Sequence, residues 1–150
     1  GEQLRIFRRL PGLEKAEFAR FGSIHRNTFI CAPEVLLPTL QSKKNPALLV
    51  AGQLSGVEGY VESAAMGLLA GINAARLGHS QEPLSPPPHT ALGALCAHLT
   101  DSDPSHFQPS NVNFGLFPAW EKKVAKRHRG QIRAQRSRAA LREWVEAHRV

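Results

Sequence analysis

The sequence predicts an α/β fold, and three consecutive segments indicate it. Residues 47–52 (ALLVAG) form a short apolar run that ends at glycine, which is typical of a strand buried on both faces of a parallel sheet. A glycine-rich turn follows, and residues 61–77 then have the composition of a helix for which Gly78 fits the C-cap position. A strand, a glycine turn and a helix in this order can present successive backbone N–H groups to an oxygen-bearing ligand.

The predicted helix over 61–77 carries small residues along one face. They are Ala64, Gly67, Gly71 and Ala75. Small residues at this spacing let a helix lie close against a sheet or another backbone. The gain in packing has to offset about 1 kcal/mol of lost helix propensity at each glycine. We therefore expect this face to pack closely against a neighbour.

Two further helices are predicted downstream. Thr90 is placed to N-cap a helix over 91–99. The last helix is expected over 119–149, with a broken apolar stripe and a candidate interruption at Gly130. Three prolines in residues 101–118 indicate an extended, packed loop between these helices.

The N-terminal residues show weaker patterns. Residues 4–7 and 17–21 are short apolar-alternating runs around the turn at Pro11-Gly12, and they predict strands or loop ends. Residues 24–30 (IHRNTFI) predict a strand or an extended loop.

Positive charge is concentrated at the C-terminal end. The chain has a formal net charge of +7 from nineteen Lys and Arg against twelve acids, and residues 121–150 hold ten of these cations but three of the acids. The whole excess therefore lies in one element, for which a polyanion is the natural partner. The alternative is a solvated, charge-rich terminal helix, and charge alone does not decide between them. Few aromatic residues lie among these cations, so base stacking is not indicated.

Cysteine and apolar content narrow the class of protein. Cys31 and Cys96 form neither a metal-binding spacing nor a disulfide framework, which fits a reducing compartment and two small packed side chains. No apolar stretch is long enough to span a bilayer, and the first residues do not resemble a signal peptide. We expect a cytoplasmic protein with no membrane partner and no metal site.

The glycine turn lacks the two main phosphate-binding patterns. It has neither the Gly-Lys-Ser/Thr ending of a P-loop nor a complete G-x-G-x-x-G. What remains is a backbone site for a carbonyl or a delocalised anion, such as the pyrimidine edge of a flavin, with amides at Gly59, Tyr60 and Val61. The alternative is that the glycines only make a tight connection.

Several runs carry a family resemblance. Residues 51–65 (AGQLSGVEGYVESAA) and 67–76 resemble the C-terminal flavin-binding signature of the folate- and FAD-dependent tRNA uracil-C5 methyltransferases, and the glucose-inhibited-division protein A family is similar over this stretch. Three further runs resemble the methyltransferase branch: 25–30 (HRNTFI), 103–109 (DPSHFQP) and 113–118 (NFGLFP). The resemblance covers nearly the whole chain and corresponds to the C-terminal third of the family.

The resemblance implies the C-terminal portion of a flavoprotein with two dinucleotide-binding (Rossmann-like) domains and a helical C-terminal extension. Such an enzyme transfers a one-carbon unit from methylenetetrahydrofolate to C5 of the T-loop uridine of tRNA, using reduced FAD and NAD(P)H as reductant. Residues 1–45 would end the inserted substrate or folate domain, residues 46–118 would belong to the FAD-binding domain, and residues 119–150 would form the basic helix. The N-terminal FAD motif and the reactive cysteines of the family have no counterpart here, so we expect no catalytic residue in this chain and a missing N-terminal part of the polypeptide.

The resemblance also implies binding residues. FAD would contact Gly52, Gln53, Gly59, Tyr60 and Val61. Folate would contact His25, Arg26, Asn27 and Tyr60. The tRNA would contact Lys122, Lys123, Lys126, Arg127, Arg129 and Arg133. The alternatives are exposed strand residues at His25 and Arg26, a side chain at Tyr60 that plugs the end of a sheet, and a strand cap at Gln53.

Two other functions compete with this prediction. One is a non-catalytic basic RNA-binding module, for which the charged C-terminal segment is the argument. The other is a flavoprotein of the division-protein branch that modifies wobble uridines, against which the runs at 25–30 and 113–118 argue. In the leading hypothesis the isolated chain binds FAD poorly, transfers no methyl group and is marginally stable, because a sheet completed by absent strands leaves open edges.

Overall fold

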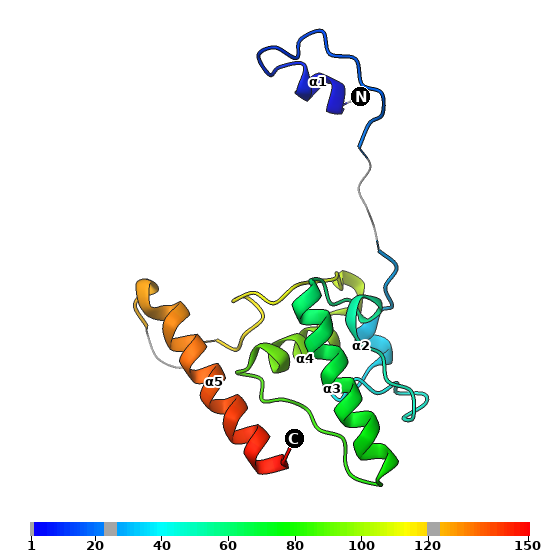
Figure 1. Cartoon of the computed structure of the whole chain (residues 1–150), viewed down its shortest axis with the longest axis vertical. Coiled ribbons are helices and arrows are strands. Elements are labelled where there is room, and N and C mark those ends of the chain that lie inside the picture. The colour runs from blue at the N-terminus through cyan, green and yellow to red at the C-terminus, as the bar shows by residue number, and fades with distance from the viewer. Residues whose placement is uncertain (1, 23–26, 120–123) are drawn as a thin grey trace.

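Helices make up most of the ordered secondary structure of the protein (Figure 1). The computed structural model describes residues 2–22, 27–119 and 124–150. Its α-helices are α1 Glu2–Phe7, α2 Ala32–Val35, α3 Tyr60–Gly78, α4 Ala91–Asp101 and α5 Arg129–His148. Three short 3₁₀ helices complete the set: η1 Gly52–Ser55, η2 Pro104–His106 and η3 Lys126–His128. None of the helices in these ranges is long and apolar enough to cross a membrane.

One hydrophobic core joins α2, α3 and α4 to the loops that follow η1 and η2. Its ten buried members are Ala32, Leu36, Leu40, Val57, Met66, Leu69, Leu95, Cys96, Leu99 and Phe107. α2 packs against α4 and η2, and α3 packs against η1 and α4. The core therefore includes residues from both sides of position 45, and the predicted three-part division of the chain stays a prediction.

The predicted strand over 47–52 is wrong for the described residues, where pairing is limited to isolated bridges. These join Leu36 to Ser42, Gln41 to Leu49, and Val57 to Ser110. Ser42 N donates to Leu48 O at 2.8 Å and Val50 N donates to Leu40 O at 3.0 Å, so the run pairs with its own preceding loop. A strand in a parallel sheet needs a neighbour brought in by a crossover connection, and none of the described segments supplies one beside this run.

α3 confirms the predicted helix, with ends at Tyr60 and Gly78. Gly78 is its last residue rather than the cap, and Ser80 takes the left-handed conformation with φ of 56°. The buried face holds Met66, Leu69 and Asn73. The Asn73 side chain donates to Thr39 O and Leu84 O and accepts from Leu84 N, which ties the proline-rich loop to the helix.

The small-residue face of α3 is open, which corrects the expectation of close packing there. A Cβ built on Gly67 or on Gly71 would meet no atom within 4 Å. Leu68 beside them is 67% exposed. The described residues therefore provide no partner for this face, although its composition is suited to one.

In the N-terminal segment, the first of the two runs predicted as strands or loop ends is helical and the second is a loop. Residues 4–7 belong to α1, in which Arg5 pairs with Glu2 across one turn. Residues 17–21 form no strand, and the rings of Phe18 and Phe21 stack at 5.5 Å between centroids. α1 lies apart from the helices of the core in Figure 1.

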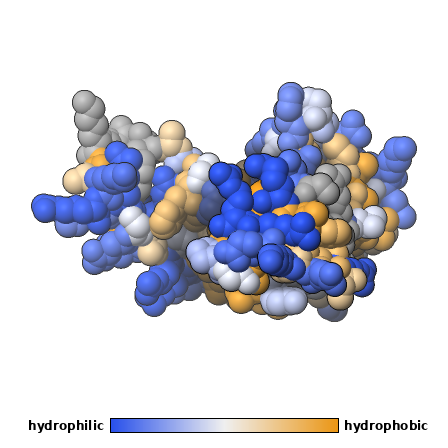
Figure 2. All heavy atoms as spheres, turned by 90° about the horizontal axis from the view of Figure 1, so that it is seen from above, coloured by the Kyte–Doolittle hydropathy of each residue, from blue (hydrophilic) through white to orange (hydrophobic). Residues whose placement is uncertain are grey.

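Of the two C-terminal helices, α4 begins where the sequence predicted and α5 does not. α4 begins as predicted, with Thr90 Oγ1 accepting from Gly93 N at 2.9 Å. α5 begins at Arg129 rather than at 119, after η3, and Gly130 lies in its first turn without breaking it. No residue of α5 is buried, and Trp144 is its contact with the core. In Figure 2 the side of the molecule that holds α5, on the left, is mostly hydrophilic.

Candidate functional site

The glycine turn between Ala51 and Tyr60 is built on the core. Ser55 Oγ donates to Gly52 O at 2.7 Å, and Gly56 N donates to Gln53 O at 3.0 Å. Paired hydrogen bonds with Ser110 then hold the end of the turn, because Glu58 N donates to Ser110 O and Ser110 N donates to Gly56 O. The turn is thereby fixed against the loop that follows η2.

The residues of the run at 103–109 have structural roles in the loop around η2. Asp103 caps η2 by accepting from Ser105 N at 2.9 Å. Hydrogen bonds from Ser105, then from His106, lower the pKa of this carboxyl. The bend sends Phe107 into the core beneath Gly56. This run therefore supports the glycine turn from below.

A cavity of about 490 Å³ lies where the turn meets α3. It is lined by Asn27, Gln53, Val57, Glu58, Gly59, Tyr60 and Ser63. Four of these are residues that the sequence predicted for FAD or folate, so the structure brings Asn27 beside Gln53, Gly59 and Tyr60. It adds Val57, Glu58 and Ser63, which the sequence did not predict. Ser63 is four residues after Gly59, one helical turn on, and that spacing was the available signal.

The helix N-terminus supplies hydrogen-bond donors at this cavity. Gly59 is the N-cap of α3 with φ of 94°, and no side chain caps it. Within the described ranges, the amides of Gly59, Tyr60 and Val61 donate to no other group. The first amides of a helix lack intrahelical acceptors and carry its partial positive charge. An acceptor atom of a ligand can satisfy them.

The polar side chains around the cavity offer both donors and acceptors. The Gln53 amide does both, the Glu58 carboxylate accepts, and Ser63 Oγ lies 3.4 Å from Val57 O. Tyr60 adds a flat ring that is 97% exposed. Such a set suits a planar heterocycle whose edge alternates carbonyl oxygens with N–H groups.

The other predicted cofactor residues lie elsewhere. Gly52 is buried, and a Cβ on it would lie 3.5 Å from Ser63 Cβ, so it supports the cavity wall without lining it. Val61 is 79% exposed on α3 and is not among the lining residues. His25 and Arg26 fall outside the described residues.

The predicted tRNA residues lie around the start of α5. Lys126, Arg127 and Arg129 are exposed, and Arg129 Nε donates to Val124 O at 2.9 Å. Lys122 and Lys123 fall outside the described residues. Arg133 differs from its neighbours because it is half-buried and engaged with another segment.

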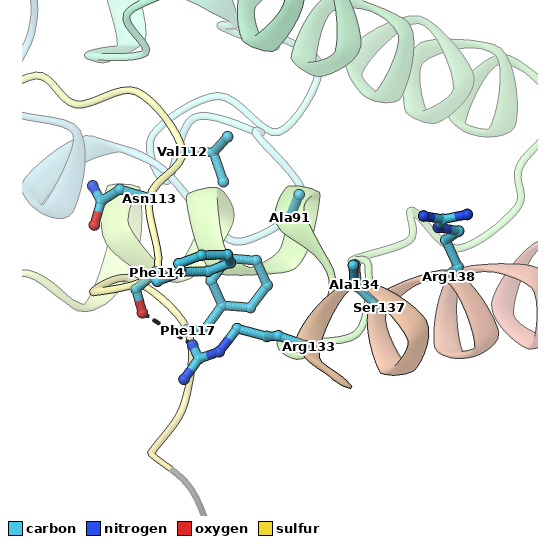
Figure 3. Close-up of a pocket in the computed structure, with 9 residues that line it drawn as sticks. All are labelled: Ala91, Val112, Asn113, Phe114, Phe117, Arg133, Ala134, Ser137 and Arg138. Atoms are coloured by element: carbon cyan, nitrogen blue, oxygen red, sulfur yellow. Dashed lines mark hydrogen bonds between the residues drawn. The ribbon is translucent and has the colours of Figure 1, made fainter. Parts of the chain in front are cut away.

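Arg133 contacts two aromatic rings from the run at 113–118 (Figure 3). Its Nη1 donates to Phe114 O at 3.0 Å, and its guanidinium carbon lies 5.0 Å from the Phe117 ring centre and 5.7 Å from that of Phe114. Both distances are within the range of cation–π contacts. The fold thus places aromatic rings beside the basic helix, although the sequence has few among its cations.

The two cysteines are packed side chains, as predicted. Cys96 is 2% exposed in the core, and burial raises the pKa of its thiol to about 12. Cys31 is half-buried, with Sγ 3.7 Å from Pro104 O. Both are free thiols. A thiol with a raised pKa holds its proton at neutral pH and is a poor nucleophile.

The turn, the helix N-terminus and the mixed donor set meet at one cavity, which is the candidate site. The family described as glucose inhibited division protein A matches residues 1–82, and the chain belongs to that family. This agrees with the resemblance seen in the sequence.

Curated relatives match nearly the whole chain. The methylenetetrahydrofolate–tRNA-(uracil-5-)-methyltransferase TrmFO of Desulfotalea psychrophila is 67% identical over 149 residues, which are 99% of this chain and 34% of that protein. The protein of the same name from Geobacter sulfurreducens is 58% identical over 96% of this chain and 33% of its own length. A solved structure of Aquifex aeolicus GidA is 31% identical over 65% of this chain and 16% of its own, with a TM-score of 0.46. The chain thus spans about one third of the length of the curated relatives it matches.

Proposed function

We propose that this chain is the C-terminal part of an enzyme that transfers a one-carbon unit from methylenetetrahydrofolate to C5 of the T-loop uridine of tRNA. The observation that carries the proposal is the single cavity shared by Asn27, Gln53, Gly59 and Tyr60. Independent support comes from the 67% identity to a relative named for this reaction. The cytoplasm is the compartment where such an enzyme meets tRNA, folate and NAD(P)H.

FAD is the cofactor we propose at this cavity, and its donors and acceptors fit. The amides of Gly59 and Tyr60, which line the cavity, would donate to an acceptor-rich ring edge and stabilise the negative charge of a reduced ring, as an oxyanion hole does. Gln53 and Glu58 would hydrogen-bond the other polar atoms of the ring edge. Gly52, which has no side chain, lets the turn lie close to Ser63 in the cavity wall. When bound, FAD supplies the redox step that folate-dependent methylation requires, with NAD(P)H as the proposed reductant.

We place folate across the cavity from the turn. Tyr60 presents an exposed ring on which a pterin can stack, and Asn27 lines the same cavity. His25 and Arg26 directly precede Asn27 in the sequence. An arginine can pair bidentately with the carboxylates of a folate tail, and the imidazole of His25 can stack on the pterin.

The rest of the enzyme lies in polypeptide that precedes this segment in the relatives. We propose that it supplies the Rossmann-like sheet, the catalytic cysteines and the surface that covers the open face of α3. The core thiol of Cys96 serves packing in this scheme. The cations at Lys122, Lys123, Lys126, Arg127, Arg129 and Arg133 position tRNA through its phosphates and do not select its sequence.

A chimera tests the proposal. The C-terminal third of the Desulfotalea psychrophila relative is replaced by this chain, and flavin absorbance and methyl transfer to a tRNA transcript are measured. We expect a flavin-bound, active chimera, loss of flavin in Gln53→Ala, and no effect of Gln81→Ala, an exposed glutamine beyond α3. The isolated 150-residue chain should transfer nothing. A flavin-free chimera, or an isolated chain that methylates tRNA, would contradict the proposal.

A further inference from the structure

A second cavity lies between α5 and the segment 112–117. It measures about 550 Å³ and is bounded by the Phe114 and Phe117 rings, Val112, Ala91 and the Ala134–Arg138 face of α5 (Figure 3). This volume is in the usual range for small-molecule sites. It lies apart from the proposed cofactor cavity and shares no lining residue with it.

The walls of this cavity are apolar and its rim is cationic. Phe114 is 63% exposed, which leaves a ring face open to solvent. Arg133 holds both rings in place through its cation–π contacts and its hydrogen bond to Phe114 O. Arg138 lines the cavity from the exposed side of α5, and Ser137 adds a hydroxyl.

This combination matches an unpaired nucleobase attached to its phosphates. Every base has a π-face that stacks on aromatic rings, and its neighbouring phosphates need cations at the rim. α5 carries five arginines and two glutamates, so its field favours a polyanion over an apolar peptide.

We propose that this cavity accepts one unpaired base of a bound RNA, stacked on Phe114 and Phe117, with the arginines of α5 on the flanking phosphates. The inference rests on the proposed function insofar as tRNA is the RNA that this enzyme binds. It adds a base-stacking subsite to a surface otherwise expected to contact the phosphate backbone only. The cavity then distinguishes exposed loop bases from paired ones.

Two RNA probes test the subsite with the full 150-residue chain. One is a short single-stranded oligouridylate with a central 2-aminopurine, and the other has an abasic site at that position. Stacking of one base predicts that the intact strand binds about 5- to 150-fold more tightly than the abasic strand. The 2-aminopurine fluorescence should also change on binding.

Three variants locate the effect. Phe114→Leu keeps the apolar volume but removes one ring, and Ser137→Met fills the cavity while leaving both rings. Each should bring the affinity ratio toward one without changing the salt dependence of binding. Phe21→Leu, at an exposed ring in the N-terminal segment, should leave the ratio unchanged.

The outcomes separate the subsite from the proposed function. Salt-dependent binding with equal affinity for both strands overturns the subsite and leaves the phosphate contacts of α5 in place. A ratio that survives in both Phe114→Leu and Ser137→Met also overturns it. Absence of salt-dependent binding overturns the RNA contact itself, and the subsite with it.

Discussion

Gly56 is the glycine of the turn that packs directly against the core ring of Phe107. Its φ of 96° is unfavourable for residues with a Cβ, and a Cβ there would lie 2.6 Å from the Phe107 ring. We expect Gly56→Ala to lower the free energy of unfolding by about 1–3 kcal/mol, measured by urea denaturation. Phe107→Leu should relieve part of this cost, so a double-mutant cycle should show coupling. Strict additivity would mean that the ring plays no part.

The buried thiol of Cys96 should make the free energy of unfolding fall at alkaline pH. Burial raises the pKa of its thiol from 9.0 to about 12, so the folded state holds this proton more tightly than the unfolded state does. The stabilisation is complete below the unfolded pKa and falls as the pH rises from 9.0 toward about 12. The total is on the order of 4 kcal/mol.

Comparison with Cys96→Ala isolates this thiol from other groups that titrate in the same range. The variant loses packing at neutral pH, so it should be less stable than the native chain there. Because its stability lacks the thiol-linked decline, the difference should shrink between neutral pH and about pH 10, measured by urea unfolding at both. Parallel pH profiles for the two proteins would contradict the assignment.

At the scale of single elements, a substitution on the open face of α3 should change stability in opposite directions in the isolated chain and in the chimera. Nothing lies within 4 Å of a Cβ on Gly67, so Gly67→Ala should stabilise the isolated chain by about 1 kcal/mol through helix propensity. In the chimera this face is covered under our proposal, and the added methyl should cost stability instead. Thermal unfolding of both proteins measures the difference.

Gly93 provides the matched control, because it is also a helical glycine. A Cβ there would collide with the backbone carbonyl of Pro87, so Gly93→Ala should destabilise the isolated chain and the chimera alike. A stabilising Gly67→Ala in both proteins would show that α3 stays open, and that the preceding polypeptide packs elsewhere.

Local signals predicted the elements that depend on local contacts. The Thr90 cap and the helix at 60–78 depend on hydrogen bonds between residues three or four positions apart, so their local sequence is sufficient to predict them. The run at 47–52 has strand composition, but a strand also needs a partner from elsewhere in the chain. The last helix begins at Arg129 instead of 119, and its contact with the 113–118 run through Arg133 is likewise a long-range feature that helical periodicity does not encode.

Residues of the candidate sites were likewise predictable where they lie together in the sequence and were missed where the fold brings distant segments together. Gly59 and Tyr60 were predictable as lining residues because they belong to the glycine turn, whereas Gln53 and Asn27 came from the family resemblance. Glu58 lines the cavity but was not predicted, because an acidic side chain near a helix N-terminus is favourable without any ligand. The base-stacking cavity was missed because its rings and its arginines come from segments about twenty residues apart in the sequence, Phe114 and Arg133.

For the molecule as a whole, α5 is held less firmly than the core it borders. It has no buried residue, and its contacts include Trp144 on the core and Arg133 on the 113–118 run. α4, in contrast, buries Gly93, Ala94, Leu95, Cys96 and Leu99. Elements with few buried contacts open at lower free energy than the core does. The isolated chain should therefore unfold in steps rather than in one sharp transition.

Two probes separate these steps. In a Trp120→Phe, Cys31→Ala background, Trp144 fluorescence reports on α5 and thiol labelling of Cys96 reports on the core. We expect the fluorescence change to occur at lower urea than the exposure of Cys96, because α5 detaches first. Arg133→Leu should lower the first midpoint and leave the second unchanged, since it removes the clamp on Phe114 and Phe117 without touching the core. Coincident midpoints would mean that α5 and the core form one cooperative unit, and that the few contacts along α5 are stronger than their burial indicates.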